Sequence, residues 1–203
     1  MDMQGSKALA VTQAQAWDAL NDPDILKACI AGCDKLEATG PGQYAVGMAV
    51  KIGPVAARFT GKIHLTEVQA PESYTLNFEG QGGAAGFGKG QAQVRLQPQG
   101  SGCELAYTVR AQVGGKIAQL GQRLIDGVAR GMAEDFFKRF DAEMQRLHPE
   151  SYAQAEVALD EAPAGVATAA ASSQSPAAVA RSSMWIWVAG AAIVLAGVVW
   201  WLR

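Results

Sequence analysis

A glycine-rich stretch, GAAGFGKG at residues 83–90, comes close to a phosphate-binding loop. Such a loop reads G-x-x-x-x-G-K-[ST], and its backbone N–H groups hold a nucleotide phosphate at the start of a helix. Here Gly90 stands where a serine or threonine would bind the metal ion, and the alternating residues that follow predict a strand. We therefore expect a glycine-rich hairpin near the mouth of a cavity, with Phe87 as its candidate gate, and no nucleotide site.

Cysteine and histidine are too sparse for a metal centre or a catalytic triad. The chain has three cysteines and two histidines. Cys29 and Cys33 are close in sequence, but Cys103 is the only further thiol, whereas a structural zinc site usually has four converging ligands. The carboxylates are scattered over predicted outer faces. We therefore expect reduced cysteines, no metal site, no catalytic residue and no enzymatic activity.

The charge balance argues against nucleic acid as a partner. The chain has 17 Lys and Arg against 19 Asp and Glu, a formal net charge of -2. Proteins that bind nucleic acid usually present a basic face. The first residues, MDMQGSKALAV, have neither an apolar core nor a cleavage site, so they do not resemble a secretory signal. We therefore expect the folded domain to lie in the cytoplasm.

Apolar and polar residues alternate through much of the chain, which predicts antiparallel strands. In VAARFTGKIHL, residues 55–65, the two kinds fall on opposite sides, as in a strand with one buried face. The same period recurs at 46–52, 74–78, 92–96 and 105–113, and segments rich in glycine and proline separate the runs. These patterns predict a meander with one dry face.

Helical patterns occupy the two ends of this domain. Thr12 and Asp22 are predicted N-caps of two short helices, and Pro23 suits a first helical position. Residues 114–148 carry an apolar stripe of helical period, which Pro149 ends. This order of elements predicts an α+β fold, in which the long helix lies across the concave side of a curved antiparallel sheet.

Glycines interrupt the predicted long helix at Gly121, Gly127 and Gly131, each at a cost of about 1 kcal/mol relative to alanine. They are consistent with close packing of the helix on the sheet, or with room for a ligand beside Gly121 and Gly131. The residues predicted to point toward the interior are the candidates for lining such an apolar pocket. Each of them could equally well be an ordinary core residue. These candidates are Trp17, Met48, Val50, Phe59, Ile63, Phe78, Phe87, Tyr107, Leu120, Leu124, Val128 and Met132.

The chain ends in a run that predicts a membrane-spanning helix. Residues 184–202 carry no charge, and a helix of that length would span roughly 28 Å, close to the roughly 30 Å hydrocarbon core of a bilayer. Tryptophan pairs lie at both ends, where indole rings favour the membrane interface. Residues 151–183, rich in Ala, Ser and Pro, predict a flexible linker. The expected organisation is a folded domain over 1–150, this linker, and an anchor over 184–203; the alternative for the last segment is a buried helix.

Four segments together resemble the CoxG family of carbon monoxide dehydrogenase subunits. They are MDMQGSKAL, AWDALNDPDILKACIAGCDKLE, VKIGPVAARFTGKI and VGGKIAQLGQRLIDGVARGMAEDFF, and the resemblance covers residues 1–147. Ala31 stands where members commonly have a proline, a change that affects only the stiffness of a turn. The family belongs to the START-like (SRPBCC), helix-grip superfamily, so the resemblance implies that fold. The terminal run is also similar to the tails of some members.

The resemblance also implies a function. It points to a non-catalytic accessory protein that recruits a molybdenum hydroxylase, carbon monoxide dehydrogenase or a relative, to the cytoplasmic face of the inner membrane. An apolar cavity would bind a respiratory quinone, menaquinone or ubiquinone, without a covalent cofactor. By residue type, Tyr107 is the one strand residue with both an apolar body and a hydroxyl that could meet a quinone carbonyl. The alternatives are a carrier of lipid or quinone without a dehydrogenase partner, and an enzyme, since some helix-grip proteins are cyclases or hydrolases.

Overall fold

The computed structural model describes residues 1–160, which belong to one compact unit. Seven strands and four helices follow each other along the chain, with two short 3-10 turns. In order they are β1 (Asp2–Leu9), α1 (Gln13–Leu20), α2 (Pro23–Cys29), β2 (Cys33–Gly40), β3 (Gln43–Ile52), β4 (Val55–Gln69), β5 (Ser73–Gln81), η1 (Gly83–Ala85), β6 (Phe87–Gln99), β7 (Gly102–Gly114), η2 (Ala118–Leu120), α3 (Gln122–Leu147) and α4 (Pro149–Asp160).

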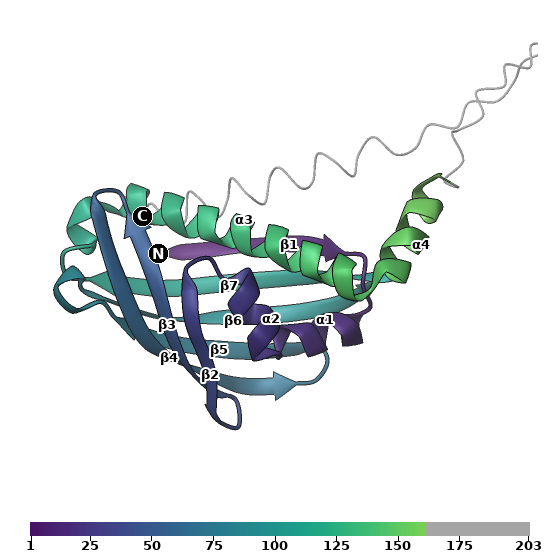
Figure 1. Cartoon of the computed structure of the whole chain (residues 1–203), viewed down its shortest axis with the longest axis horizontal. Coiled ribbons are helices and arrows are strands. Elements are labelled where there is room, and N and C mark those ends of the chain that lie inside the picture. The colour runs from purple at the N-terminus through teal and green to yellow at the C-terminus, as the bar shows by residue number, and fades with distance from the viewer. Residues whose placement is uncertain (161–203) are drawn as a thin grey trace, which may run out of the picture. The chain divides into compact units, whose positions relative to one another are not determined.

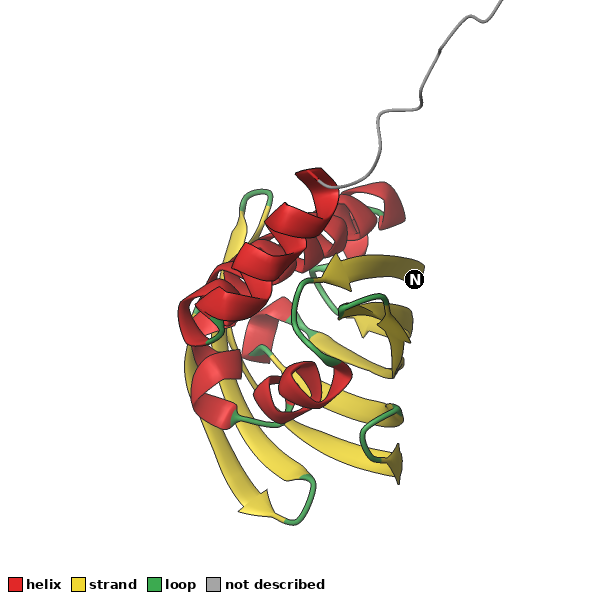
Figure 2. Cartoon of the chain, turned by 90° about the vertical axis from the view of Figure 1, so that its right-hand side faces the viewer, coloured by secondary structure: helices red, strands yellow, loops and turns green. Residues whose placement is uncertain are grey.

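The strands form one antiparallel sheet in the order β1-β7-β6-β5-β4-β3-β2. Strands β2 to β7 are a meander, and β1 closes the far edge by pairing with β7. The sheet is strongly curved, and α1, α2 and α3 lie on its concave side (Figures 1 and 2). This arrangement confirms the predicted α+β, helix-grip fold.

Local sequence signals account for the short helices and for the faces of the strands. Thr12 accepts a hydrogen bond from the backbone of Gln15, whose side chain accepts one in return, a complete capping box at the start of α1. Asp22 caps α2, and Pro23 occupies its first turn. Along β4, exposure alternates residue by residue from 55 to 64, as the sequence predicts. One face of the sheet is therefore dry.

The long helix begins later than its apolar period suggests. Gly115 and Gly121 have φ angles of 83° and 91°, a left-handed backbone that a helix does not contain. Between them the chain forms the turn η2, and α3 starts only at Gln122. The prediction of a helix from residue 114 is therefore wrong over its first eight residues, because two glycines end the regular backbone there.

A further helix, α4, follows Pro149 and occupies residues 149–160. The side chain of Tyr152 packs against the core, and its hydroxyl donates to the Asp141 carboxylate at 2.7 Å. The expectation of a flexible linker from residue 151 is thus wrong for its first ten residues. The rest of that linker and the predicted span at 184–203 lie outside the described residues. Among residues 1–160, no helix is both long and apolar enough to cross a bilayer.

The buried residues form two separate clusters. The larger one joins α1, α2, β1, β6 and β7 to the C-terminal half of α3, where Phe140 and Met144 are wholly buried. The smaller one comprises Ile52, Ala85 and Ile117, with partly buried neighbours from β3, β4 and the N-terminal half of α3. The interior is therefore not one continuous core.

Candidate functional site

Two adjoining apolar cavities lie on the concave side of the sheet. They have volumes of about 340 Å³ and about 280 Å³. The side chains of Ile30, Ile63 and Leu76 line both of them, so the two cavities share a wall. Small-molecule sites in proteins are concave, mostly apolar spaces of roughly 300–1,000 Å³. The pair is therefore a candidate site for an apolar ligand.

The first cavity lies under β3, β4 and β5. Met48 pairs with Phe59 across β3 and β4, and Ile63 pairs with Phe78 across β4 and β5, so period-two alternation brings these side chains to one face. Met132 of α3 covers them from the opposite side. The smaller core cluster closes this end, since Ile52 and Ile117 belong both to that cluster and to the cavity wall.

The second cavity lies toward the larger core cluster. Leu20 and Leu26 of the short helices and Phe136 and Phe137 of α3 face the sheet across it. Three tyrosines, Tyr44, Tyr74 and Tyr107, come from the strands. The only hydroxyl groups on this wall belong to these tyrosines, so within residues 1–160 they are the polar handles of an otherwise apolar space.

Glycines in the sheet make room for the aromatic rings of the wall. A Cβ atom at Gly82 would lie 2.5 Å from the ring of Phe59, and one at Gly90 would lie 2.7 Å from the ring of Phe78. Both rings therefore rest directly on glycine backbone. The Gly90 that breaks the phosphate-loop pattern has this packing role, and it lies in strand β6 as predicted.

The glycines that interrupt the predicted long helix behave differently. A Cβ atom at Gly121, Gly127 or Gly131 would meet no other atom within 4 Å. Close packing of the helix on the sheet therefore does not require these glycines, and that alternative is wrong. Gly131 is partly buried and precedes Met132 of the first cavity wall, so the space beside it adjoins the candidate site.

The structure brings seven of the twelve predicted pocket residues to the cavity walls. They are Met48, Val50, Phe59, Ile63, Phe78, Tyr107 and Met132. Their inward phase places them there, as the alternation of each strand and the stripe of the helix predict.

Four of the other five pack beside the cavities without lining them. The ring of Trp17 contacts Tyr74 within the larger core cluster. Leu120 and Val128 pack against the smaller cluster. Leu124 is 39% exposed and lies near Gly53 in the β3–β4 turn. The helical period of these apolar residues predicts which side faces the sheet. It does not distinguish residues that line a cavity from residues packed in the core.

Phe87 is a clearer correction. It shares the phase of Lys89 and Gln91, which point to the outer face of the sheet, and it is 39% exposed. Its ring covers Gly114 of β7, where a Cβ atom would lie 2.4 Å away. The prediction that Phe87 gates the cavity is wrong, because the residues of β6 that face inward are Gly88, Gly90 and their successors at every second position.

Tyr74 and Tyr44 were not among the predicted pocket residues, although the pattern contained a signal for Tyr74. It has the same phase as Leu76 and Phe78 in a run already predicted to be a strand. Only 6% of Tyr74 is exposed, and burial raises the pKa of its hydroxyl, with a smaller contribution from the nearby Tyr44. The expectation that Tyr107 is the one strand residue able to offer a hydroxyl is therefore wrong.

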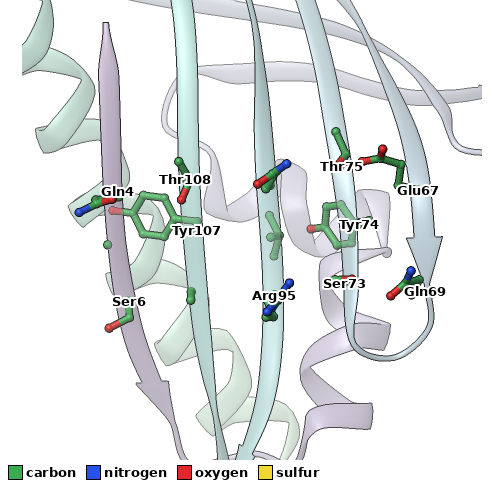
Figure 3. Close-up of a pocket in the computed structure, with 14 residues that line it drawn as sticks. Gln4, Ser6, Glu67, Gln69, Ser73, Tyr74, Thr75, Arg95, Tyr107 and Thr108 are labelled. Atoms are coloured by element: carbon green, nitrogen blue, oxygen red, sulfur yellow. Dashed lines mark hydrogen bonds between the residues drawn. The ribbon is translucent and has the colours of Figure 1, made fainter.

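Tyr107 itself lies at the edge of the site. Its ring packs against Phe137 with centroids 5.3 Å apart. It pairs with Gly5 across β7 and β1, and a Cβ atom at Gly5 would lie 2.6 Å from the Tyr107 hydroxyl. Figure 3 shows the ring reaching toward β1. The ring thus belongs to the cavity wall, whereas the hydroxyl lies against the edge strand.

The larger hollows of the described domain lie on the outer face and are polar. One, of about 820 Å³, is lined by side chains such as Gln4, Ser6, Arg95 and Thr108 (Figure 3). On the same face Thr75 is buried, and its hydroxyl donates to Glu67 at 2.6 Å, so its polar group is satisfied. These solvated side chains cover an ordinary outer sheet surface, so we place the candidate site in the smaller apolar cavities.

The cysteines do not come together as a reactive group. Cys29 and Cys103 are buried in the larger core cluster, and burial raises the pKa of each thiol to about 11. Cys33 is partly exposed at the start of β2. Within residues 1–160 no three His, Cys, Asp or Glu side chains are grouped so that they could hold a metal ion. The buried thiols therefore act as small core side chains.

The curved sheet, the gripping helix and the apolar interior together define a protein of the START-like, helix-grip class. The model of the CoxG family of carbon monoxide dehydrogenase subunits matches residues 5–145. The chain therefore belongs to the CoxG family. A search of curated proteins found no match.

Solved structures share this fold. A conserved protein from Geobacillus kaustophilus is 36% identical, with a TM-score of 0.68, and the match covers 72% of this chain and 96% of that one. The Geobacillus protein is thus a chain little longer than the matched region. A protein from Thermus thermophilus (13% identity, TM-score 0.57, covering 72% of this chain and 99% of that one) shares the fold. So does the Zhui aromatase/cyclase of a Streptomyces species (12% identity, TM-score 0.52, covering 72% and 94%).

Proposed function

We propose that this chain is an accessory protein of carbon monoxide dehydrogenase or a related molybdenum hydroxylase, and that it holds an apolar ligand in its interior. Membership of the CoxG family supports the association with a dehydrogenase. The pair of cavities between the two core clusters carries the ligand part of the proposal. A domain of this size would normally fill such space with side chains, because empty volume in a core is destabilising.

The ligand proposed is a respiratory quinone, menaquinone or ubiquinone. A quinone ring is flat and apolar with two carbonyl oxygens, and the walls offer apolar and aromatic side chains with a few tyrosine hydroxyls. A bound quinone would accept electrons that the recruited enzyme releases. The protein would supply binding and orientation, and the quinone would supply the redox chemistry.

The proposed site of action is the cytoplasmic face of the inner membrane. The uncharged run at residues 184–202, with tryptophans at both ends, supports a single C-terminal anchor. The folded domain and the dehydrogenase would then lie close to the bilayer in which quinones dissolve. Membrane lipid is thus a further partner in the proposal.

Ligand content is tested by extraction of the purified 1–160 domain with organic solvent, followed by mass spectrometry. We expect a quinone or another lipid-like molecule in the extract. Ile63→Trp fills the wall common to both cavities and should abolish retention, whereas the neighbouring His64→Trp, on the outer face and outside both cavity walls, should not. Thermal melting shows whether either variant is folded. Absence of any such molecule, together with no binding on titration, would leave only a protein–protein role.

Recruitment is tested separately in cells that make the full chain or a form ending at Ser183. We expect the dehydrogenase to sediment with membranes only when the full chain is present. The full-length Ile63→Trp variant should still recruit the enzyme but slow electron delivery to the respiratory chain. Unchanged sedimentation with the truncated form would contradict the tethering role. Repeated capture of the chain without a molybdenum enzyme would instead favour a carrier of lipid or quinone.

A further inference from the structure

Tyr74 places a hydroxyl group in the wall of an otherwise apolar cavity. More than nine-tenths of the residue is buried, yet its oxygen is not wholly enclosed by protein atoms. In the described part of the chain this hydroxyl makes no hydrogen bond, and burial raises its pKa because the charged form would be poorly solvated. A hydroxyl so placed can find a hydrogen-bond partner only in whatever occupies the cavity. A ligand atom that accepts a hydrogen bond would be such a partner.

The residues around Tyr74 do not meet this need. Val94, its cross-strand partner on β6, is apolar. Trp17 stands edge-on to its ring, and an indole N–H can donate but not accept. Tyr44 lines the same cavity and contributes to the raised pKa of Tyr74, but within residues 1–160 no hydrogen bond joins the two hydroxyls. Tyr74 also borders the polar hollow of Figure 3, but it has the inward phase of Leu76, so its hydroxyl is left as a donor on the side of the ligand space.

We propose that the Tyr74 hydroxyl is the polar anchor of the cavity and donates a hydrogen bond to an oxygen atom of the bound ligand. The ligand class is then an apolar molecule with an accepting oxygen, such as the carbonyl of a ketone, an ester or a quinone. This inference rests on the proposed function and deepens it, because it names the protein atom that separates such molecules from plain hydrocarbons.

Selectivity for ligands with an accepting oxygen follows because a buried hydroxyl without a partner costs more free energy than a formed hydrogen bond contributes. A site that hydrogen-bonds a ligand oxygen discriminates against an analogue without it, because the polar group of the site then stays unpaired. A hydrocarbon that fills the cavity would shut the Tyr74 hydroxyl away from both water and a partner. Tyr152 lines neither cavity and its hydroxyl donates to Asp141, so Tyr152→Phe offers a matched control.

The test uses the 1–160 domain with two probes that carry the same four methyl groups on a six-membered ring, duroquinone and the hydrocarbon durene. Every ring position of duroquinone that is not a carbonyl is methylated, so thiols do not add to it readily. Equilibrium dialysis measures both dissociation constants. We expect Tyr74→Phe to weaken duroquinone binding by about five- to tenfold. Durene binding should be unchanged or tighter, and Tyr152→Phe should leave the ratio of the two constants as in the parent domain.

Infrared spectroscopy gives a readout that does not depend on a variant. A hydrogen bond lowers the carbonyl stretching frequency of bound duroquinone below its value in hexane. We expect this lowering in the parent domain and in Tyr152→Phe, and its loss in Tyr74→Phe. A hexane-like carbonyl in the parent domain would overturn the proposal even if Tyr74→Phe failed to fold.

The remaining outcomes separate this inference from the function on which it rests. If both probes bind and Tyr74→Phe changes neither constant, the anchor is wrong while an apolar-ligand site stands. If Tyr44→Phe carries the loss instead, the assignment to Tyr74 is also wrong. If neither probe binds the folded parent domain, the inference and the ligand part of the proposed function fall together.

Discussion

The ring of Trp17 stands edge-on to the ring of Tyr74, with centroids 5.6 Å apart and ring planes at 74°. Trp17 belongs to α1 and Tyr74 to β5, so this pair joins a short helix near one end of the chain to the middle of the sheet. Edge-to-face aromatic pairs contribute about 0.5–1.5 kcal/mol beyond their buried area. The contact therefore stabilises the fold and also holds in place the ring whose hydroxyl lines the cavity.

We expect Trp17→Ala to lower the free energy of unfolding of the 1–160 domain by about 2–3 kcal/mol, near the low end for a large aromatic side chain, because Trp17 is only partly buried. Trp17→Phe keeps an aromatic edge and should lose about 1 kcal/mol. Urea denaturation followed by circular dichroism measures both. Equal stabilities for the two variants would show that the aromatic contact has no part in the stabilisation.

The fold was largely predictable because its signals are local. The capping side chains of Thr12 and Asp22 act within three residues, and the alternation along β4 needs no knowledge of the rest of the sheet. The apolar stripe of α3 likewise reports which side of the helix is buried. Each of these features depends on neighbours in sequence, so the sequence alone was enough to place them.

The features that were missed depend on partners far away in the chain. Helix α3 begins only after Gly121 because this residue has a positive φ, and the apolar period of the sequence does not predict that angle. Phe87 faces outward because β6 is in register with β5 and β7, and a glycine-rich run has too few side chains to show its phase. Tyr74 had the right phase, but only the lack of an acceptor among the described residues around it distinguishes it from a core tyrosine.

The glycines of the α3 region should respond to alanine with opposite signs. Gly131 lies within the helix with open space around its Cα, so we expect Gly131→Ala to raise the free energy of unfolding by about 0.5–1 kcal/mol. Gly121 also has open space, but its φ of 91° disfavours any other residue, so Gly121→Ala should lower it by about 1–2 kcal/mol. Chemical denaturation of the two variants checks the contrast, and a shared sign would contradict it.

Stability should fall at alkaline pH through the buried thiols. Burial raises the pKa of Cys29 and Cys103 from 9.0 to about 11 in the folded protein. Below pH 9.0 both the folded and the unfolded protein keep these thiols protonated. Between pH 9.0 and about 11 the unfolded chain releases the protons while the folded protein still binds them, so the free energy of unfolding decreases as the pH rises. Urea midpoints measured across that interval should decrease. Relative to its own urea midpoint at neutral pH, Cys103→Ala should lose less over this interval than the parent domain, because it has one buried thiol fewer. An equal decrease in both proteins would contradict the assignment to the buried thiols.

Ile117 closes the end of the first cavity that the smaller core cluster occupies. It is 4% exposed, packs with Ile52 and Ala85, and its N–H donates to the Ala85 carbonyl at 2.9 Å. Ile117→Ala should lower the free energy of unfolding by about 2–4 kcal/mol and speed the release of a bound apolar probe, because it removes part of the cavity wall. Leu120→Ala is the matched control, since Leu120 packs on the same cluster without lining the cavity. Stopped-flow release of duroquinone into excess lipid vesicles measures the rates. If the two variants release the probe equally fast, Ile117 acts only as a core residue and the ligand leaves by another side of the domain.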